Sequence, residues 1–307
     1  MRHTSRSTLL VLSCATALVG GATAAAATSP SPPPPTRPAV VADGLAAPLS
    51  LAVTSRGDLY VTQDGGLLTR ITRAGQRTDV VSAAPASAEA VSVDRGALTW
   101  TQRTDDGAFT ATSSVLFRMA RDGTTTQTDV LAYEASANPD QVNTYGIQGL
   151  DPACTATVPA ELAPFLLPYT GRVDSHAYAT LPVGSTTYIA DAGANAVLAV
   201  SAAGDVSTVA VLPPTAITLT AEMAAGFGLD ACVAGHEFWA EPVPTDVETG
   251  RDGKLYVTSL PGGAEDDSLG ANGAVYRVDP RTGQVSLVAR GFVGATGLAV
   301  APTGKIY

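Results

Sequence analysis

The sequence contains few of the residues that zinc, thiol and serine chemistry require. It has three cysteines and three histidines among 307 residues, and it has no Cys-x-x-Cys pair. A zinc-protease motif begins at His236-Glu237, but Ala240 stands where the second histidine is needed. The Gly-x-Ser-x-Gly elbow of serine hydrolases is also absent. These absences exclude the common motifs of zinc proteases, thiol oxidoreductases and serine hydrolases.

Basic residues are scarce as well. The chain has 18 Lys and Arg against 28 Asp and Glu, which gives a formal net charge of -10. Proteins that bind nucleic acid neutralise phosphates with basic side chains, so nucleic acid is not an expected partner. An acidic exported domain suits divalent cations or cationic surfaces, although a net charge of this size also serves solubility alone.

Long apolar runs are absent beyond the N-terminus, so no membrane span of roughly 18 residues is expected. At the N-terminus, Arg2 and Arg6 precede an apolar run over residues 9–19, and residues 22–24 (Ala-Thr-Ala) fit a cleavage site. We interpret residues 1–27 as a secretory signal peptide. The Pro-rich residues 28–39 are expected to form an extended linker. The mature protein is therefore predicted to be secreted.

A lipoprotein signal that ends at Cys14, in the segment 11–14 (Val-Leu-Ser-Cys), is the minor alternative. Only about six apolar residues precede Cys14, which is short for the apolar core of a signal peptide. On this alternative the protein would be anchored at the cell surface.

Four segments of the remaining chain repeat one another. They cover residues 48–83, 88–133, 185–212 and 244–289, and a fifth copy runs from Ala295 to Tyr307. Each holds four short runs of alternating or β-branched apolar residues, joined by turn dipeptides such as Asp122-Gly123. One such sheet cannot bury both faces, so units of this kind stack around an axis. The repeats predict an all-β fold: a β-propeller over residues 40–307, with four full blades and part of a fifth.

The two longest insertions between repeats, residues 134–174 and 213–243, each carry a cysteine. Once Cys14 leaves with the signal peptide, Cys154 and Cys232 remain as an even pair in an oxidising compartment, so we predict a disulfide between them. Both insertions follow the last strand of a blade, and the extended turns 101–113 and 259–273 belong to the same face. Neutral insertion would not favour one face, so we expect this face to bind a ligand or partner. We also expect the disulfide to link adjacent blades at its rim.

Polar side chains are expected around the channel mouth on this face. Alignment of the repeats places Glu89 and Asp246 at one level, and Asp191 and Asn195 follow a second strand. Carboxylate and amide oxygens are ligands for Ca²⁺, so these four residues are the candidate metal ligands. The alternative is that Asp191 caps its loop and that Asn195 only bonds backbone.

Two histidines, His176 and His236, could serve as a base in the mature chain, although a structural role is the more common one for a lone histidine. Aromatic residues on the insertions are candidate ligand contacts, or they pack the insertions onto the blades: Tyr145, Phe165, Tyr169, Phe227, Phe238 and Trp239. We assign the ligand-facing surface to four residues in particular: Tyr145, His176, His236 and Trp239.

The segment 188–197 (Tyr-Ile-Ala-Asp-Ala-Gly-Ala-Asn-Ala-Val) resembles the core of an NHL repeat. With the segment 276–283 (Tyr-Arg-Val-Asp-Pro-Arg-Thr-Gly), the order of repeats is similar to the ScyD/ScyE family of exported bacterial propellers. The resemblance covers nearly all of residues 40–307. It implies a TolB-like propeller with six blades, and hence a C-terminally truncated sequence, but it assigns no catalytic set.

The resemblance also implies kinship with a wider superfamily that includes metal-dependent lactonases, whose Glu, Asn and Asp ligands surround the channel mouth. Two classes of function remain. The first is an exported binding or scaffold protein that holds an unknown small molecule or protein at the decorated face, and it is our leading prediction. The second is a Ca²⁺-dependent lactonase or esterase with a cation in the channel mouth.

Overall fold

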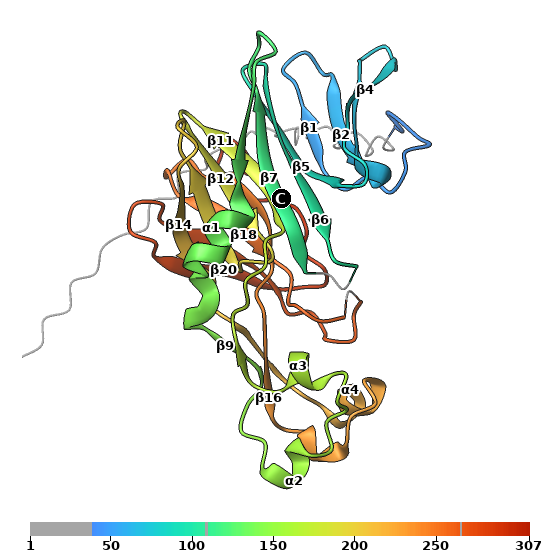
Figure 1. The fold of residues 1–307 in the computed structure, drawn as a ribbon, viewed down its shortest axis with the longest axis vertical. Helices are drawn as coiled ribbons and strands as arrows, with labels where there is room; N and C mark the ends of the chain where they lie inside the picture. The colour runs from blue at the N-terminus through green and yellow to red at the C-terminus, as the bar shows by residue number, and fades with distance from the viewer. Residues whose placement is uncertain (1–38, 108–109, 265) are drawn as a thin grey trace, which may run out of the picture. The chain divides into compact units, whose positions relative to one another are not determined.

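The structure is a computed structural model that describes residues 39–107, 110–264 and 266–307 (Figure 1). Its contacts divide the chain into two units, Met1–Val40 and Val41–Tyr307. The predicted signal peptide (1–27), Cys14 and nearly all of the predicted linker (28–39) lie outside the described residues. Among the described residues, no helix combines the length and the apolar character that crossing a membrane requires.

Each of the four full repeats forms a four-stranded antiparallel sheet whose strands follow chain order. The first sheet contains β1 (Leu51–Val53), β2 (Leu59–Gln63), β3 (Leu67–Ile71) and β4 (Arg77–Ser82), with the short helix η1 (Asp64–Gly66) between β2 and β3. The second contains β5 (Ser87–Asp94), β6 (Ala97–Asp105), β7 (Ala111–Met119) and β8 (Thr125–Asp129). The third contains β11 (Ala177–Val183), β12 (Thr186–Asp191), β13 (Ala196–Val200) and β14 (Val206–Val211). The fourth contains β17 (Pro244–Thr249), β18 (Leu255–Ser259), β19 (Gly273–Val278) and β20 (Val285–Phe292).

The apolar runs of each repeat fold as strands because they are buried between neighbouring sheets. A cluster that includes Val197 and Leu212 from the third repeat and Val257 and Tyr276 from the fourth packs these two sheets together. The tight turn between β1 and β2 depends on Gly57, whose φ of 83° lies in the left-handed region. The prediction of four strands per sheet is confirmed, but the first strand of the third sheet, β11, precedes the predicted bounds of its repeat (185–212).

The first strands of the four sheets lie next to one another. Strand β5 contacts both β1 and β11, and β11 contacts β17. Residues of all four strands line one cavity of about 520 Å³, to which Gly297 and Leu298 also contribute. Sheets arranged radially around a shared cavity are the arrangement of a β-propeller. Beyond the fourth sheet, the start of the fifth repeat forms a small hairpin with a bridge between Val300 and Ile306.

The two insertions form a fifth four-stranded sheet, in the order β10-β9-β16-β15. Its strands are β9 (Thr144–Ile147), β10 (Tyr169–Thr170), β15 (Thr215–Thr218) and β16 (Glu237–Ala240). The short helices η2 (Pro139–Val142), α2 (Pro152–Thr155), α3 (Ala163–Leu166), α4 (Ala221–Gly226) and η3 (Ala231–Val233) surround it. The sheet has its own core, which includes Ile147, Val233 and Phe238. We call residues 139–174 and 213–243 the insertion module.

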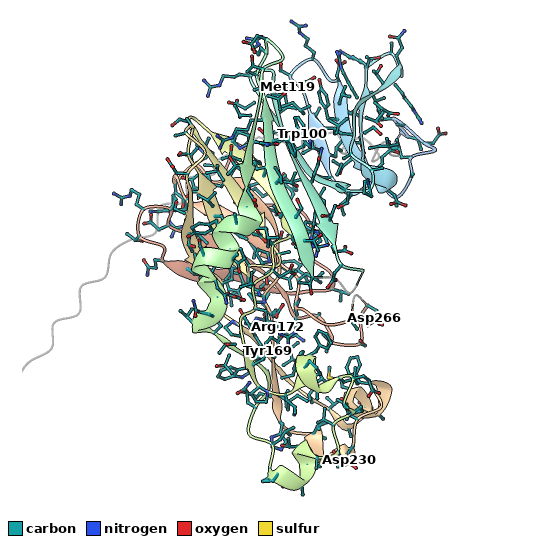
Figure 2. The ribbon with its side chains drawn as sticks, viewed as in Figure 1. Trp100, Met119, Tyr169, Arg172, Asp230 and Asp266 are labelled. Atoms are coloured by element: carbon teal, nitrogen blue, oxygen red, sulfur yellow. A yellow bond between two sulfur atoms is a disulfide. The ribbon has the colours of Figure 1, made fainter. Side chains whose placement is uncertain are left out.

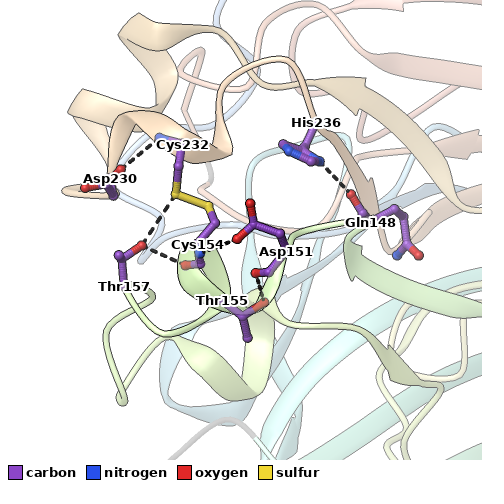
Figure 3. Close-up of a disulfide and its surroundings, with 8 residues drawn as sticks. All are labelled: Gln148, Asp151, Cys154, Thr155, Thr157, Asp230, Cys232 and His236. Atoms are coloured by element: carbon purple, nitrogen blue, oxygen red, sulfur yellow. Dashed lines mark hydrogen bonds between the residues drawn. A yellow bond between two sulfur atoms is a disulfide. The ribbon is translucent and has the colours of Figure 1, made fainter.

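The predicted disulfide is present, but its place differs from the expectation. Cys154 and Cys232 are bonded, with their Cα atoms 5.8 Å apart (Figure 3). The bond joins α2 to η3 inside the insertion module, so the expectation that it links adjacent blades at the rim is wrong. The physical reason is that β9 and β16 pair with each other, with Phe238 opposite Ile147, and carry the two cysteines away from the repeat sheets together.

The fourth strand of the second repeat is shorter than the repeat pattern indicates. The sequence assigns residues up to Tyr133 to this strand, whereas β8 ends at Asp129 and α1 (Val130–Ala137) follows it. The Asp129 carboxylate accepts a hydrogen bond from the Ala132 amide at 2.9 Å. This N-cap satisfies an otherwise free donor of the first helical turn and so favours the helix.

Candidate functional site

Glu89 and His176 form a hydrogen-bonded pair between the second and third sheets. Glu89 lies on β5 and is 5% exposed. His176 precedes β11, and its Nε2 contacts Glu89 Oε2. The Ser87 hydroxyl donates to the other carboxylate oxygen. The structure thus brings together a predicted metal ligand and a predicted base that are 87 positions apart in the sequence.

Two opposing effects set the pKa of Glu89. Burial raises this pKa, but the hydrogen bonds from His176 and Ser87 and the charges of His176 and Arg103 outweigh burial and hold it below its ordinary value. Glu89 therefore stays ionised and holds the imidazole in place. The His176 side chain is 32% exposed, so the pair is open to solvent. A carboxylate that orients a partly exposed histidine is an arrangement that can move protons.

Asp191 ends β12 and is fully buried. Its Oδ1 accepts from the backbone amides of His176 at 2.7 Å and of Gly193 and Ala194 at 3.2 Å. Its Oδ2 accepts from the Ser175 hydroxyl at 2.7 Å. Burial raises the pKa of Asp191 in spite of these donors. Asp191 therefore caps the turn after β12.

Asn195 and Tyr145 meet at a buried carboxylate. The Asn195 Nδ2 donates to Asp140 Oδ2 at 2.9 Å, and the Tyr145 hydroxyl donates to the same oxygen at 3.1 Å. The Asn195 Oδ1 accepts from the Val243 amide at 3.1 Å. Burial raises the pKa of Asp140 to about 6. Asn195 thus fastens the insertion module to the third sheet, while the Tyr145 bond lies within the module, and neither of these buried side chains faces solvent.

Asp246 lies on β17 and lines the cavity of about 520 Å³. Its Oδ1 accepts from the Val247 amide and its Oδ2 from the Leu298 amide, both at 2.8 Å. Burial raises the pKa of Asp246. On the same wall, burial and the Asp246 charge raise the pKa of Glu248 to about 6. The cavity wall thus carries two carboxyl groups that take up protons more readily than usual.

The four predicted metal ligands do not form one group. Both oxygens of Glu89, Asp191 and Asp246 already accept from protein donors. In the described ranges, no three His, Cys, Asp or Glu side chains lie close enough together to hold a metal ion. Calcium binding by these residues would require them to exchange partners, and it stays a prediction.

The other two predicted face residues lie on the insertion module. His236 Nδ1 lies 3.0 Å from the backbone oxygen of Gln148 (Figure 3). Trp239 Nε1 donates to Glu237 Oε2 at 3.0 Å, within β16. Both side chains are partly exposed, and neither lines a cavity described below.

The insertion module encloses two connected cavities. The smaller has a volume of about 220 Å³ and an almost entirely apolar wall, made of Ile147, Leu162, Leu166, Leu219, Phe227, Leu229, Phe238, Gly263, Ala264 and Leu269. The larger, of about 510 Å³, shares Leu162, Leu166, Phe238 and Gly263 with it. Thr110 and Gly262 also line the larger cavity, so both insertions and both extended turns contribute. We call the two cavities together the module pocket.

The larger cavity also has polar lining residues, among them Tyr169, Arg172 and Glu241. The Tyr169 hydroxyl donates to Glu241 Oε1 at 2.8 Å, and burial with the Glu241 charge raises the pKa of Tyr169 above its ordinary value. The Arg172 guanidinium carbon lies 4.4 Å from the centroid of the Tyr169 ring and 5.2 Å from that of Phe165 (Figure 2). A cation in this position is held by the aromatic rings and stays available to a ligand.

Four of the six aromatic residues predicted as ligand contacts line the module pocket: Phe165, Tyr169, Phe227 and Phe238. Sequence reasoning missed Arg172. Its signal was present, because Arg172 is the only Lys or Arg in residues 134–174 and 213–243. A single positive charge among the aromatic residues of the insertions indicated a possible ligand contact.

No protein-family description matches the chain, and no curated protein matches it. Solved structures do resemble it. A protein of unknown function from Bacteroides caccae has 11% identity and a TM-score of 0.42, over 80% of this chain and 60% of its own. A gluconolactonase from Xanthomonas campestris has 14% identity and a TM-score of 0.45, over 83% of this chain and 65% of its own. Virginiamycin B lyase from Staphylococcus aureus has 12% identity and a TM-score of 0.41, over 85% of this chain and 83% of its own.

The chain thus spans less than two thirds of the length of the Bacteroides and Xanthomonas proteins. At such scores and identities the likeness carries no functional argument, so function is argued from the residues of this chain.

Proposed function

We propose that this protein is an exported propeller-type binding protein that holds a small apolar molecule in the module pocket. Membership of the ScyD/ScyE family, whose complete members have six blades, belongs to the same proposal. The single observation that carries it is the apolar cavity of about 220 Å³ that opens into a wider one. Ligand sites are typically apolar hollows with a few polar groups at one end.

Two further features support a binding role. The disulfide closes the module at α2 and η3, and disulfides are typical of exported proteins. The contacts of Asn195 with Asp140 and with the Val243 amide fix the module on the third sheet. A preorganised pocket loses less conformational entropy when a ligand binds.

The test is a fluorescence titration with N-phenyl-1-naphthylamine, a neutral apolar probe. Wild-type protein should bind it saturably. Ala264→Trp, which fills the smaller cavity, should weaken binding at least about tenfold, since it removes most of the buried contact. Ala203→Trp is the matched control, because Ala203 is exposed in the turn between β13 and β14. Absence of saturable binding, or equal binding by Ala264→Trp, would refute the pocket as the site.

A second candidate is hydrolysis of a lactone or ester at the channel mouth, favoured by the hydrogen-bonded Glu89–His176 pair. With Glu89 on Nε2, the imidazole can use Nδ1 to accept a proton from an attacking water. His176→Gln should then abolish hydrolysis of a lactone panel, and His236→Gln should leave it unchanged.

The calcium prediction is tested on the same protein. If Glu89, Asp191, Asn195 and Asp246 bind Ca²⁺, excess Ca²⁺ should raise the melting temperature relative to EDTA, by linkage between binding and folding. The shift should vanish in Asp246→Asn. A calcium-independent hydrolysis that needs His176 would separate the role of the Glu89–His176 pair from the metal hypothesis.

A further inference from the structure

The two cavities of the module pocket differ in character, and the difference defines a direction. Leu162, Leu166 and Phe238 line both of them, so a molecule can extend from one into the other. The side chains that line the smaller cavity are all aliphatic or aromatic. The lining of the larger cavity also includes the charged residues Arg172 and Glu241. A ligand that fits both cavities has an apolar body and one polar end.

Arg172 is the group of the larger cavity that can receive an anionic end. The carboxylates of this cavity already have partners: Asp174 accepts from the Ala111 amide and lies 3.7 Å from Arg103, and Glu241 accepts from the Tyr169 hydroxyl. Arg172 forms no ion pair with any residue in 39–107, 110–264 or 266–307, and its polar contact there is to the Pro164 carbonyl. Glu241 likewise has no basic partner among the described residues, so the larger cavity offers one positive and one negative group without a counter-ion, and the positive one is Arg172.

The aromatic rings fix where this charge lies. Tyr169 and Phe165 support the Arg172 guanidinium from its faces. Its remaining N–H groups form a planar fork that matches the two oxygens of a carboxylate. Phe165 and Leu166 belong to α3, which also forms the wall common to both cavities.

We propose that the module pocket binds an aliphatic monocarboxylate, whose hydrocarbon chain fills the apolar cavity and whose carboxylate pairs with Arg172. This inference rests on the proposed binding function and adds the chemical class of the ligand. The charge pair lies at an exposed position, so it contributes selectivity more than affinity.

The experiment is displacement of N-phenyl-1-naphthylamine by decanoate, 1-decanol and decylamine, which share one chain and differ in the head group. For wild-type protein, decanoate should displace the probe at a concentration about fivefold lower than decanol. Decylamine should be the weakest of the three competitors. Arg172→Met keeps an unbranched side chain without the charge. In this variant decanoate and decanol should displace the probe at equal concentrations, and the concentration for decanol should be the same as for wild type. Arg121→Met is the control, since Arg121 is exposed in the turn between β7 and β8, and it should keep the preference.

The outcomes separate the two proposals. If the probe binds but wild type shows no preference for decanoate, or if Arg172→Met keeps the preference, the monocarboxylate inference is overturned while the binding function stands. A preference for decylamine would assign the head group to Glu241 and would also overturn it. If neither the probe nor any of the three compounds binds, the proposed function itself fails.

Discussion

The side-chain amide of Asn195 donates a hydrogen bond to Asp140 across 55 positions of sequence. It joins the turn after β12, in the third repeat sheet, to the η2 helix of the insertion module. Asp140 is fully buried, and a buried carboxylate that loses a donor pays a desolvation cost. The position of the module pocket relative to the repeat sheets therefore depends on a few buried polar contacts.

Asn195→Gly should lower the free energy of unfolding by about 2 kcal/mol, because it removes one of the donors to Asp140. Glycine is chosen because Asn195 has a φ of 51°, which alanine would adopt only with strain. Urea denaturation measures the change. The matched control is Arg95→Gly, at an exposed residue with a φ of 47°, and it should be neutral or slightly stabilising. Equal effects of the two substitutions would contradict the role of the side chain.

Arg118→Lys should destabilise the protein by roughly 2 kcal/mol. The Arg118 guanidinium on β7 donates to the Thr187 hydroxyl and to the carbonyls of Val200 and Ser201, so it joins the second and third sheets through a fork that lysine lacks. The measurement is again urea denaturation, with Arg121→Lys as the exposed control. A loss of less than about 0.5 kcal/mol would show that the three bonds contribute little.

Glu134→Gln should remove part of the pH dependence of stability. Glu134 is fully buried, both carboxylate oxygens lack a hydrogen-bond partner within the described chain, and burial raises its pKa from 4.5 to about 8. A raised pKa means that the folded state holds a proton that the unfolded state releases. The stability from this proton is complete below pH 4.5 and is lost as the pH rises through about 8.

Wild-type protein should therefore lose stability between pH 5 and pH 9, by a few kcal/mol at roughly 1.4 kcal/mol for each pKa unit. Glu134→Gln should show a flatter profile and exceed wild type at pH 9. Glu222→Gln, on the exposed surface of α4, serves as the control and should follow wild type. Parallel profiles for wild type and Glu134→Gln would rule out Glu134 as the titrating group.

Replacement of both cysteines, Cys154→Ser with Cys232→Ser, should destabilise the protein by up to about 4 kcal/mol, since the bond closes a loop with a sequence separation of 78. The loss should be seen first as faster amide hydrogen exchange in β9, β15 and β16. Amides of β12 and β13 should keep their protection, because these strands are buried in the repeat sheets. Uniform acceleration throughout the chain would show that the module and the sheets unfold together.

The repeat sheets were predictable because their pairing is local. Each hairpin joins runs a few residues apart, and turn glycines such as Gly57 mark where the chain reverses. The insertion sheet was not predictable in this way. Its central pair, β9 and β16, joins runs of four residues that lie about ninety positions apart, and a period-2 pattern over four residues identifies no partner.

The candidate site was predicted only in part, for a similar reason. The sequence singled out Glu89 and His176 separately, but their hydrogen bond forms between two sheets whose relative placement no local pattern gives. Asp191 and Asn195 stand where the second strand ends, as the repeats indicate, but there Asp191 accepts from the His176 amide and Asn195 donates to Asp140. Arg172 became a candidate only when α3 and Tyr169 placed it at the mouth of a cavity.

The covalent loop from Cys154 to Cys232 has a mechanical consequence. The third repeat sheet, β11 to β14, lies entirely inside it. A pulling force applied on either side of the loop passes through the sulfur atoms and bypasses the enclosed residues. Under tension the first, second and fourth sheets should extend while the third stays folded and short. A reductant would then release up to about 250 Å of additional contour length, at roughly 3.3 Å per residue.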